Sequence, residues 1–133
     1  MTDFPVTIFH NPACGTSRNV VAMVETAGYR PEVVEYLKAG WNVDQLKALF
    51  AEAGLTPREA MREKGSPATE LGLLDPGTPD TAILAAMVAH PVLVNRPIVR
   101  TPRGAALCRP SEKVFDLLEQ APDRFVKEDG QVV

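Results

Sequence analysis

The feature that most constrains the fold is the order of the elements predicted near the start of the chain. Residues 6–9, VTIF, are a short apolar run typical of a buried β-strand. From Gly15 onward the apolar residues recur at helical spacing, and Gly28 is typical of a helix C-terminus. A second strand is predicted from Val33 to Leu37. Two strands joined by a helix predict a βαβ unit with parallel pairing through a right-handed crossover.

The middle of the chain predicts a helical insertion over about 42–90. Asn42, Thr56 and Thr78 are residue types that cap helix N-termini, and proline follows both threonines at the first helical position. Residues 65–77 are rich in Gly and Pro and are predicted to form a loop between the second and third helices. We therefore expect this section to add helices, and no strand, to the fold.

The last part of the chain predicts an antiparallel hairpin followed by a helix. Strands over 96–99 and 105–108 flank TPRG at 101–104, which suits a type I turn. Ser111 can cap a final α-helix, and the polar tail after Pro122 is predicted to be partly loose. A βαβ half followed by a ββα half predicts an α/β fold of the thioredoxin-like class, with a mixed sheet.

Length and composition set the broad class of the protein. Residues 1–133 are long enough for one domain with its own core. The net charge of −3 argues against a generic nucleic-acid-binding face, and no apolar run approaches the roughly 20 residues of a membrane span. The N-terminal residues MTDFPVTIFH lack the pattern of a secretory signal. We therefore expect a cytoplasmic protein without nucleic-acid or membrane partners, in which both cysteines are free thiols.

The acidic residues are unevenly distributed along the chain. Residues 4–24 and 81–111 contain no Asp or Glu, so all 17 carboxylates lie outside these two stretches. The second stretch nevertheless holds Arg96, Arg100, Arg103 and Arg109. Burial in strands explains missing acids, but it does not explain four arginines. If the two stretches meet in the fold, they form a positive pocket, free of carboxylates, that attracts an anion.

Cys14 lies where the first strand gives way to the first helix. The unpaired N–H groups and the positive dipole end of a helix N-terminus favour thiolate over thiol and can hold an oxyanion. His10 and Arg18 are close in sequence and can add positive charge. The residues that follow are small and leave room for a ligand: Gly15, Thr16 and Ser17. Cys14 is therefore predicted to be a reactive nucleophile.

Spacing excludes two other cysteine chemistries. A phosphate-ester phosphatase loop needs arginine at the place of Val20, and a dithiol oxidoreductase needs cysteine at the place of Ser17. A redox cycle at Cys14 would therefore take its second sulfur from another molecule. Cys108 ends an apolar strand and is predicted to be structural. Two cysteines and two histidines without a CxxC pair predict no metal site.

The motifs around Cys14 resemble the signature of the glutaredoxin-coupled arsenate reductases. The match comprises HNPACGTSRN at 10–19, HP at 90–91, NRPIV at 95–99 and LCRPSE at 107–112, in order along most of the chain. The family has a thioredoxin-like fold with a helical insertion, in agreement with the predicted order of elements. The resemblance also implies a cis peptide bond between Arg96 and Pro97.

The resemblance implies a role for each site residue. Cys14 would attack arsenate to form a thioarsenate, and His10 would lower the pKa of its thiol. Arg62, Arg96 and Arg109 would hold the oxyanion, because planar guanidinium forks suit a phosphate-shaped anion. Glutathione, as co-substrate, would displace oxygen from arsenic, and glutaredoxin would complete the reduction to arsenite. The implied activity is arsenate reduction for arsenic detoxification, without a bound cofactor.

Three alternatives stay open from the sequence. Arg58 lies close to Arg62, whose surrounding residues match the family only loosely, and competes with it as the third arginine. A thioredoxin-fold redox regulator that binds RNA polymerase is a second reading, although such regulators typically carry a CxxC sensor, which Ser17 interrupts here. A reductase of the same family with a substrate other than arsenate is a third.

Overall fold

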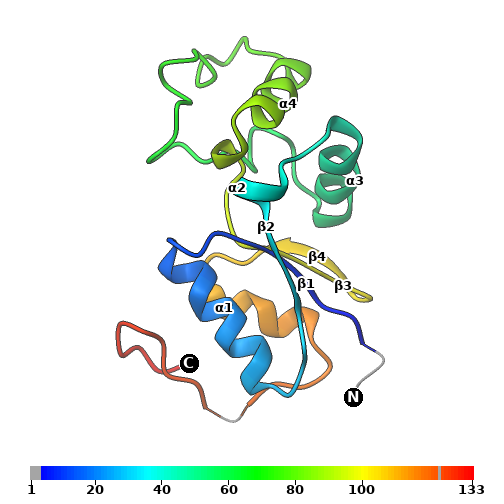
Figure 1. Ribbon diagram of the computed structural model, residues 1–133, viewed down its shortest axis with the longest axis vertical. Helices are drawn as coiled ribbons and strands as arrows, with labels where there is room; N and C mark the ends of the chain where they lie inside the picture. Colours follow the sequence, from blue (N-terminus) through cyan, green and yellow to red (C-terminus); the bar gives the residue numbers. More distant parts are fainter. Residues whose placement is uncertain (1–3, 123) are drawn as a thin grey trace. The chain divides into compact units, whose positions relative to one another are not determined.

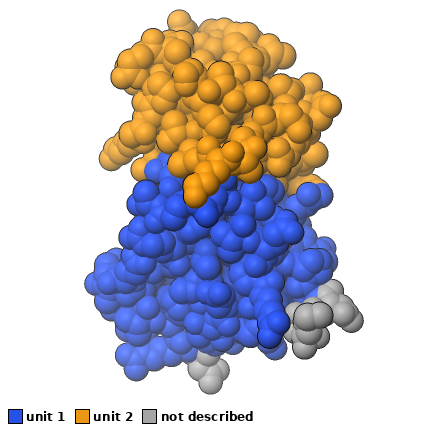
Figure 2. Space-filling model, viewed as in Figure 1, with its two compact units in different colours: residues 1–35, 96–133 blue, residues 36–95 orange. Residues whose placement is uncertain are grey.

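The computed structural model describes residues 4–122 and 124–133. The chain divides into two compact units, drawn in different colours in Figure 2 and described separately below. Unit 1 comprises residues 1–35 and 96–133, and unit 2 comprises residues 36–95. The range predicted as the helical insertion, about 42–90, falls within unit 2. None of the helices in the described ranges is long and apolar enough to cross a membrane.

Unit 1 is built on a mixed sheet. Its elements are β1 (Thr7–His10), α1 (Gly15–Thr26), β2 (Glu32–Glu35), β3 (Ile98–Thr101), β4 (Gly104–Leu107) and the 3-10 helix η2 (Ser111–Leu117). The strand order is β2-β1-β3-β4 (Figure 1). β1 pairs in parallel with β2 and antiparallel with β3, and β3 pairs antiparallel with β4. This is the predicted βαβ…ββα sheet of the thioredoxin-like class.

The core of unit 1 joins the sheet to α1 and η2. Ile8 of β1 is opposite Val99 of β3, and both side chains are fully buried. Val20 and Val24 of α1 and Val114 of η2 belong to the same apolar cluster. Alternate residues of the strands and the apolar stripe of α1 therefore pack together in one core. This packing fixes the short connection from β1 to α1, which is where Cys14 lies (Figure 1).

The final helix differs in type from the prediction. An α-helix capped by Ser111 was expected, whereas η2 is a 3-10 helix in which Ser111 is the first residue and Pro110 precedes it as the cap. The buried residues of η2 are Ser111, Val114 and Leu117. They recur every third residue, which is the period of a 3-10 helix rather than of an α-helix.

The C-terminal segment, residues 124–133, makes hydrogen bonds of its own, whereas the sequence predicted a partly loose tail. Phe125 and Val133 exchange backbone hydrogen bonds of 3.2 and 2.9 Å, so the segment folds back on itself. Nζ of Lys127 lies 2.7 Å from the carboxylate of Glu112 in η2. The prediction rested on polarity after Pro122, but these polar groups bind one another and the neighbouring 3-10 helix.

Unit 2 is helical in its regular elements. They are α2 (Tyr36–Ala39), α3 (Val43–Ala53), α4 (Asp80–Ala89) and the 3-10 helix η1 (Pro91–Leu93). Asn42 caps α3 as predicted, since its Oδ1 accepts a hydrogen bond from the backbone N–H of Gln45 at 2.8 Å. Gly54 ends α3 with a φ of 67°, a left-handed conformation that glycine adopts at low cost. The predicted helix after Thr78 is α4, but it begins one residue later than expected. Pro79, predicted at the first helical position, is the N-cap residue, and no side chain caps this helix.

Two predictions for the start and middle of unit 2 are wrong. The second strand was expected to reach Leu37, but it ends at Glu35 and Tyr36 begins α2. The buried Tyr36 hydroxyl donates to the carbonyl of Val94 at 2.9 Å, a tertiary contact that strand propensity does not anticipate. The capping box at Thr56 forms, with reciprocal bonds to Glu59 of 2.9 and 3.1 Å, yet the chain makes only turns there and no α-helix follows.

Candidate active site

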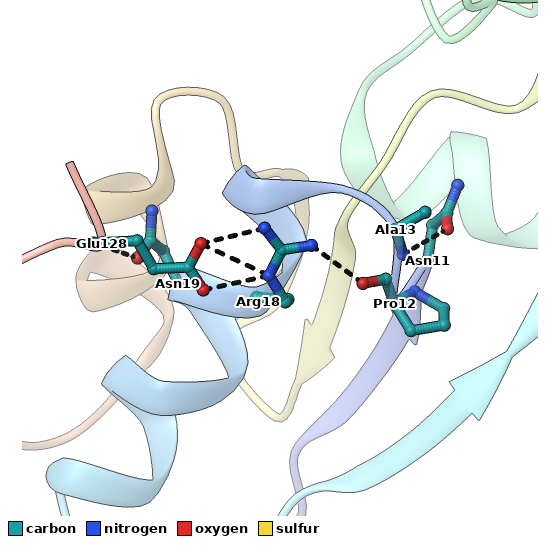
Figure 3. A network of polar contacts seen from close by, with 6 residues as sticks. All are labelled: Asn11, Pro12, Ala13, Arg18, Asn19 and Glu128. Carbon is teal, nitrogen blue, oxygen red and sulfur yellow. Dashed lines mark hydrogen bonds and ion pairs between the residues drawn. The ribbon is translucent and has the colours of Figure 1, made fainter.

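Cys14 is the N-cap residue of α1 and follows the loop that leaves β1. Its carbonyl accepts a 3.0 Å hydrogen bond from the N–H of Arg18, and its own N–H donates to the carbonyl of Asn11 at 3.0 Å. The side chain of Asn11 accepts from the N–H of Ala13 at 2.9 Å and tightens this loop (Figure 3). The half-buried cysteine therefore lies at a helix N-terminus, as the sequence predicted.

Two arginines from the second carboxylate-free stretch approach this cysteine. Nη1 of Arg109 lies 3.7 Å from Sγ of Cys14 and donates a hydrogen bond to it. The same nitrogen donates to the carbonyl of Arg96 at 3.0 Å, and hydrogen bonding by the side chain of Arg96 lowers the pKa of the Cys14 thiol. Both arginines precede cis peptide bonds, to Pro97 and Pro110; the resemblance implied the first bond, and the second is additional.

The net effect of these contacts is to hold the pKa of the Cys14 thiol below its ordinary value. Burial of the sulfur is the largest influence and acts in the opposite direction, because it raises the pKa. The backbone N–H of Ser17, the side-chain hydrogen bonds of Arg96 and Arg109, and the charge of Arg96 together outweigh burial. The site therefore favours the thiolate, which is the nucleophilic form of cysteine.

His10 of β1 contacts Ser17 in the first turn of α1. Burial lowers the pKa of His10, the charge of Glu35 raises it, and the charge of Arg18 lowers it, with a net downward shift. The ring is therefore mostly neutral at pH 7 and brings no full positive charge to the sulfur. Its Nδ1 lies 2.5 Å from Oγ of Ser17, which also accepts from the N–H of Asn11 at 3.1 Å. His10 thus supports the loop through Ser17.

The first turn of α1 consists of the small residues predicted to contact the substrate, Gly15, Thr16 and Ser17. The N–H groups of a first helical turn have no carbonyl one turn earlier in the helix, so they are available to an anion. The side chain of Ser17 is fully buried and bound to His10 and Asn11, so only its backbone can serve this purpose. The sequence identified the right turn but not this structural use of the serine hydroxyl.

Arg62 lies in unit 2, at a polar pocket of about 360 Å³. The pocket is lined by Arg58, Glu59, Met61, Arg62, Glu63, Lys64 and Asn95. Nε of Arg62 donates to the carbonyl of Lys64 at 2.9 Å, and Nη1 lies 3.4 Å from Oδ1 of Asn95. The half-buried guanidinium is therefore oriented by its neighbours at the edge of a pocket large enough for a small anion.

Arg58, the alternative third arginine, has a structural use in the same unit. Its Nη1 donates to the carbonyl of Leu73 at 3.2 Å, and its Nη2 donates to the carbonyls of Asp75 and Thr78 at 3.0 Å each. These bonds fasten the Gly- and Pro-rich loop. Because its guanidinium is engaged with three backbone carbonyls, we take Arg62 as the better candidate for binding an anion.

Cys108 has the structural place predicted for it. It is fully buried in the apolar core of unit 1, with Sγ 3.7 Å from the carbonyl of Ala106. Burial raises the pKa of the Cys108 thiol to about 12, the charge of Lys113 lowers it, and that of Asp116 raises it further. Both cysteines are free thiols, as expected. Only Cys14 combines accessibility with a lowered pKa.

Sequence reasoning missed Glu128. Nε and Nη2 of Arg18 each donate to a carboxylate oxygen of Glu128 at 3.0 Å (Figure 3). The N–H of Glu128 also donates to Oδ1 of Asn19 at 3.1 Å. The carboxylate of Glu128 therefore lies beside the first carboxylate-free stretch, which was predicted to help form a pocket free of carboxylates. No local pattern could have placed it there, since 110 residues separate it from Arg18.

Comparison with known proteins agrees with the fold and the motifs. The ArsC family model matches residues 9–117. An arsenate reductase of Synechocystis sp., ArsI1, is 57% identical over 100% of this chain and 93% of its own length. An arsenate reductase of Escherichia coli is 44% identical over 96% of this chain and 92% of its own length. The solved structure of an arsenate reductase from Vibrio cholerae superposes with a TM-score of 0.83 at 40% identity, covering 88% of this chain and 100% of that one. The chain belongs to the ArsC family.

Proposed function

We propose that the chain is an arsenate reductase in which the thiolate of Cys14 attacks arsenate. The observation that carries the proposal is the contact between Arg109 and the Cys14 sulfur, 3.7 Å apart at the N-terminus of α1. It joins a nucleophile to a cation and to helical N–H groups, which are the parts needed to bind and attack an oxyanion. The relatives that carry the name arsenate reductase support the choice of oxyanion.

Arg96 and Arg109 supply the cationic side of the proposed anion site. A tetrahedral oxyanion beside Sγ can accept hydrogen bonds from their planar guanidinium groups and from the N–H groups of residues 15–17. We assign the third arginine to Arg62, because Arg58 is engaged with three carbonyls. Preorganised donors of this kind stabilise the charge that builds up on oxygen during attack.

The proposed reaction balances in five steps. Sγ of Cys14 bonds to As(V), and one oxygen leaves as water. The sulfur of glutathione replaces a second oxygen, which also leaves as water. The thiolate of glutaredoxin attacks the glutathione sulfur, the As–S bond breaks, and its electron pair stays on arsenic as As(III), while a mixed disulfide forms. Water then displaces Cys14 from arsenic and releases arsenite, and another glutathione reduces the mixed disulfide.

External thiols are proposed because the chain offers Cys14 no good partner sulfur. Ser17 occupies the place of the second cysteine of a CxxC motif. Cys108 is buried, and its raised pKa of about 12 leaves almost no thiolate at neutral pH. Glutathione and glutaredoxin are the cytoplasmic thiols that meet this need, and the reducing cytoplasm also suits a protein with two free thiols.

The test is the formation of arsenite from arsenate. The purified chain is incubated with arsenate, glutathione, glutaredoxin, glutathione reductase and NADPH, and the arsenic species are separated and quantified. We expect arsenite to form with the wild type and not with Cys14→Ser, and we expect omission of either external thiol to stop turnover. Absence of arsenite with the complete mixture would overturn the proposal. Turnover with glutathione alone would remove glutaredoxin from it and leave the activity.

A further inference from the structure

The C-terminal segment, residues 124–133, contributes a carboxylate to the first turn of α1. That turn of the described helix has no acidic residue of its own. A Cβ placed on Gly15 would lie 3.6 Å from Nη2 of Arg18 and 3.8 Å from Oε1 of Glu128, so the ion pair lies directly against this turn. Both side chains are about half exposed. Exposed ion pairs of this kind add little to the free energy of unfolding.

Arg18 connects this carboxylate to the loop that carries Cys14. While Nε and Nη2 bind Glu128, Nη1 donates to the carbonyl of Pro12 at 2.9 Å (Figure 3). One rigid guanidinium therefore holds the C-terminal segment and the loop together. Arg18 and Cys14 are also four residues apart, the N–H of Arg18 donates to the carbonyl of Cys14 at 3.0 Å, and the charge of Cys14 acts on Arg18.

We propose that Arg18 is a positioning residue of the Cys14 site and that Glu128 holds it in place. The guanidinium fixes the Pro12 carbonyl and with it the loop that presents the sulfur. The carboxylate also balances part of the arginine charge, so the thiolate experiences only the remainder. The consequence for arsenate turnover rests on the proposed function, whereas the consequence for ionisation of Cys14 does not.

The titratable and charged groups near Cys14 come from several elements of unit 1. β1 contributes His10, and α1 contributes Arg18. Arg96 precedes β3, Arg109 precedes η2, and Glu128 lies in the C-terminal segment. Glu35 of β2 acts on His10. Glu128 is the main influence that raises the pKa of Arg18, and the Cys14 thiolate raises it as well. The main influences that lower the pKa of Cys14 itself are Ser17, Arg96 and Arg109, so changing only Arg18 and Glu128 isolates the smaller contribution of the ion pair.

The test is the pH dependence of iodoacetamide alkylation of Cys14, followed by mass spectrometry of the modified peptide. Arg18→Met removes the cation, so the alkylation midpoint should rise by about half a pH unit, the shift expected from a charge one helical turn away in water. Glu128→Gln leaves the cation unbalanced, so the midpoint should fall. The double variant should return towards the wild type. Glu25→Gln, an exposed change at the other end of α1, is the matched control and should leave the midpoint unchanged.

Arg18→Lys separates charge from position. It keeps the cation, so the midpoint should stay near that of the wild type, whereas one ammonium cannot reproduce the planar fork between Glu128 and Pro12. Arsenate turnover of Arg18→Lys should therefore be lower than that of the wild type, with kcat affected more than KM.

Two results would overturn the inference. The first is that Arg18→Met and Glu128→Gln leave the midpoint where Glu25→Gln leaves it. The second is that both variants shift it in the same direction, which would indicate general loosening of the loop. Alkylation needs no arsenate, so opposite shifts in a protein without turnover would contradict the proposed function and support this inference. Should Arg18→Met fail to fold, Arg18→Lys and Glu128→Gln still decide the question.

Discussion

Arg109 and Cys14 are 95 residues apart in sequence, yet Nη1 of the arginine donates to Sγ of the cysteine over 3.7 Å. The antiparallel pairing of β1 with β3 makes this contact possible, because Cys14 follows β1 and Arg96 precedes β3 at the same end of the sheet. Arg109 then joins the two through its bond to the Arg96 carbonyl. The proposed anion site of unit 1 is therefore a product of sheet topology.

The first prediction concerns the guanidinium fork. Arg109→Lys and Arg96→Lys keep the positive charge but lose planar, bidentate binding. Each should lower kcat/KM for arsenate by about 10- to 100-fold, as expected for loss of one hydrogen bond to a charged group, ~1.5–3 kcal/mol. Steady-state kinetics with varied arsenate measures this effect. Arg100→Lys, an exposed arginine on β3, is the matched control, and an equal loss there would show that the fork has no special role.

The second prediction concerns the ionisation of Cys14. Because hydrogen bonds and cationic charge outweigh burial and lower its pKa, alkylation should reach half its maximal rate below pH ~8.5, the ordinary value. Replacing Arg96 or Arg109 by methionine should move the midpoint upward. Peptide mapping after alkylation separates this signal from Cys108, whose thiol stays protonated and buried. A wild-type midpoint at or above the ordinary value would contradict the account of the site.

The third prediction concerns alkaline stability. Burial raises the pKa of Cys108 to about 12 in the folded protein, whereas the thiol of the unfolded chain ionises near ~8.5. The contribution of the protonated Cys108 thiol to the free energy of unfolding is therefore complete below pH ~8.5 and is lost as the pH rises towards the folded pKa. At pH 10 the loss amounts to about 2 kcal/mol. Urea unfolding of the wild type and Cys108→Ala at pH 8 and pH 10 tests this.

The comparison uses the change in unfolding free energy between the two pH values. Cys108→Ala should be less stable at both, because it leaves a small cavity. The free energy of unfolding of this variant should nevertheless fall less between pH 8 and pH 10 than that of the wild type. Parallel losses in the two proteins would show that Cys108 does not ionise on unfolding in this range.

The fourth prediction concerns the serine beneath the loop. Ser17→Ala removes the hydroxyl that binds Nδ1 of His10 and the N–H of Asn11, and it leaves two buried polar groups without that partner. The free energy of unfolding should fall by about 1–3 kcal/mol, measured by urea unfolding at pH 7. Thr16→Ala, in the same helical turn but only half buried, should cost less. An equal cost for the two changes would refute the supporting role of Ser17.

Much of unit 1 could be predicted from the sequence because its signals are local. The apolar run before Cys14, the helical period after it and Gly28 as a stop define β1 and α1 without tertiary information. The match of motifs at Cys14, Arg96 and Arg109 pointed to residues that the sheet then brings together.

The remaining features depend on contacts between distant residues. Tyrosine is a residue type that favours strands, but Tyr36 lies in helix α2, where its hydroxyl donates to the Val94 carbonyl. Ser111 was interpreted as a cap because its hydroxyl suits that place, and the apolar residues that follow it have α-helical spacing. The spacing of the buried residues by three becomes visible only in the structure. Glu128 lies in a polar tail with no motif around it, and only the fold brings it to Arg18.

The central claim is that the Cys14 thiolate forms a covalent bond with arsenic from arsenate. The most direct measurement is the intact mass of the protein after incubation with arsenate and glutathione in the absence of glutaredoxin, together with the fraction of Cys14 that remains open to alkylation. We predict an adduct that contains arsenic and glutathione, loss of Cys14 alkylation, recovery of the free thiol when glutaredoxin is added, and no adduct on Cys14→Ser. A wild-type protein whose mass stays unchanged and whose Cys14 remains fully alkylated would contradict the account.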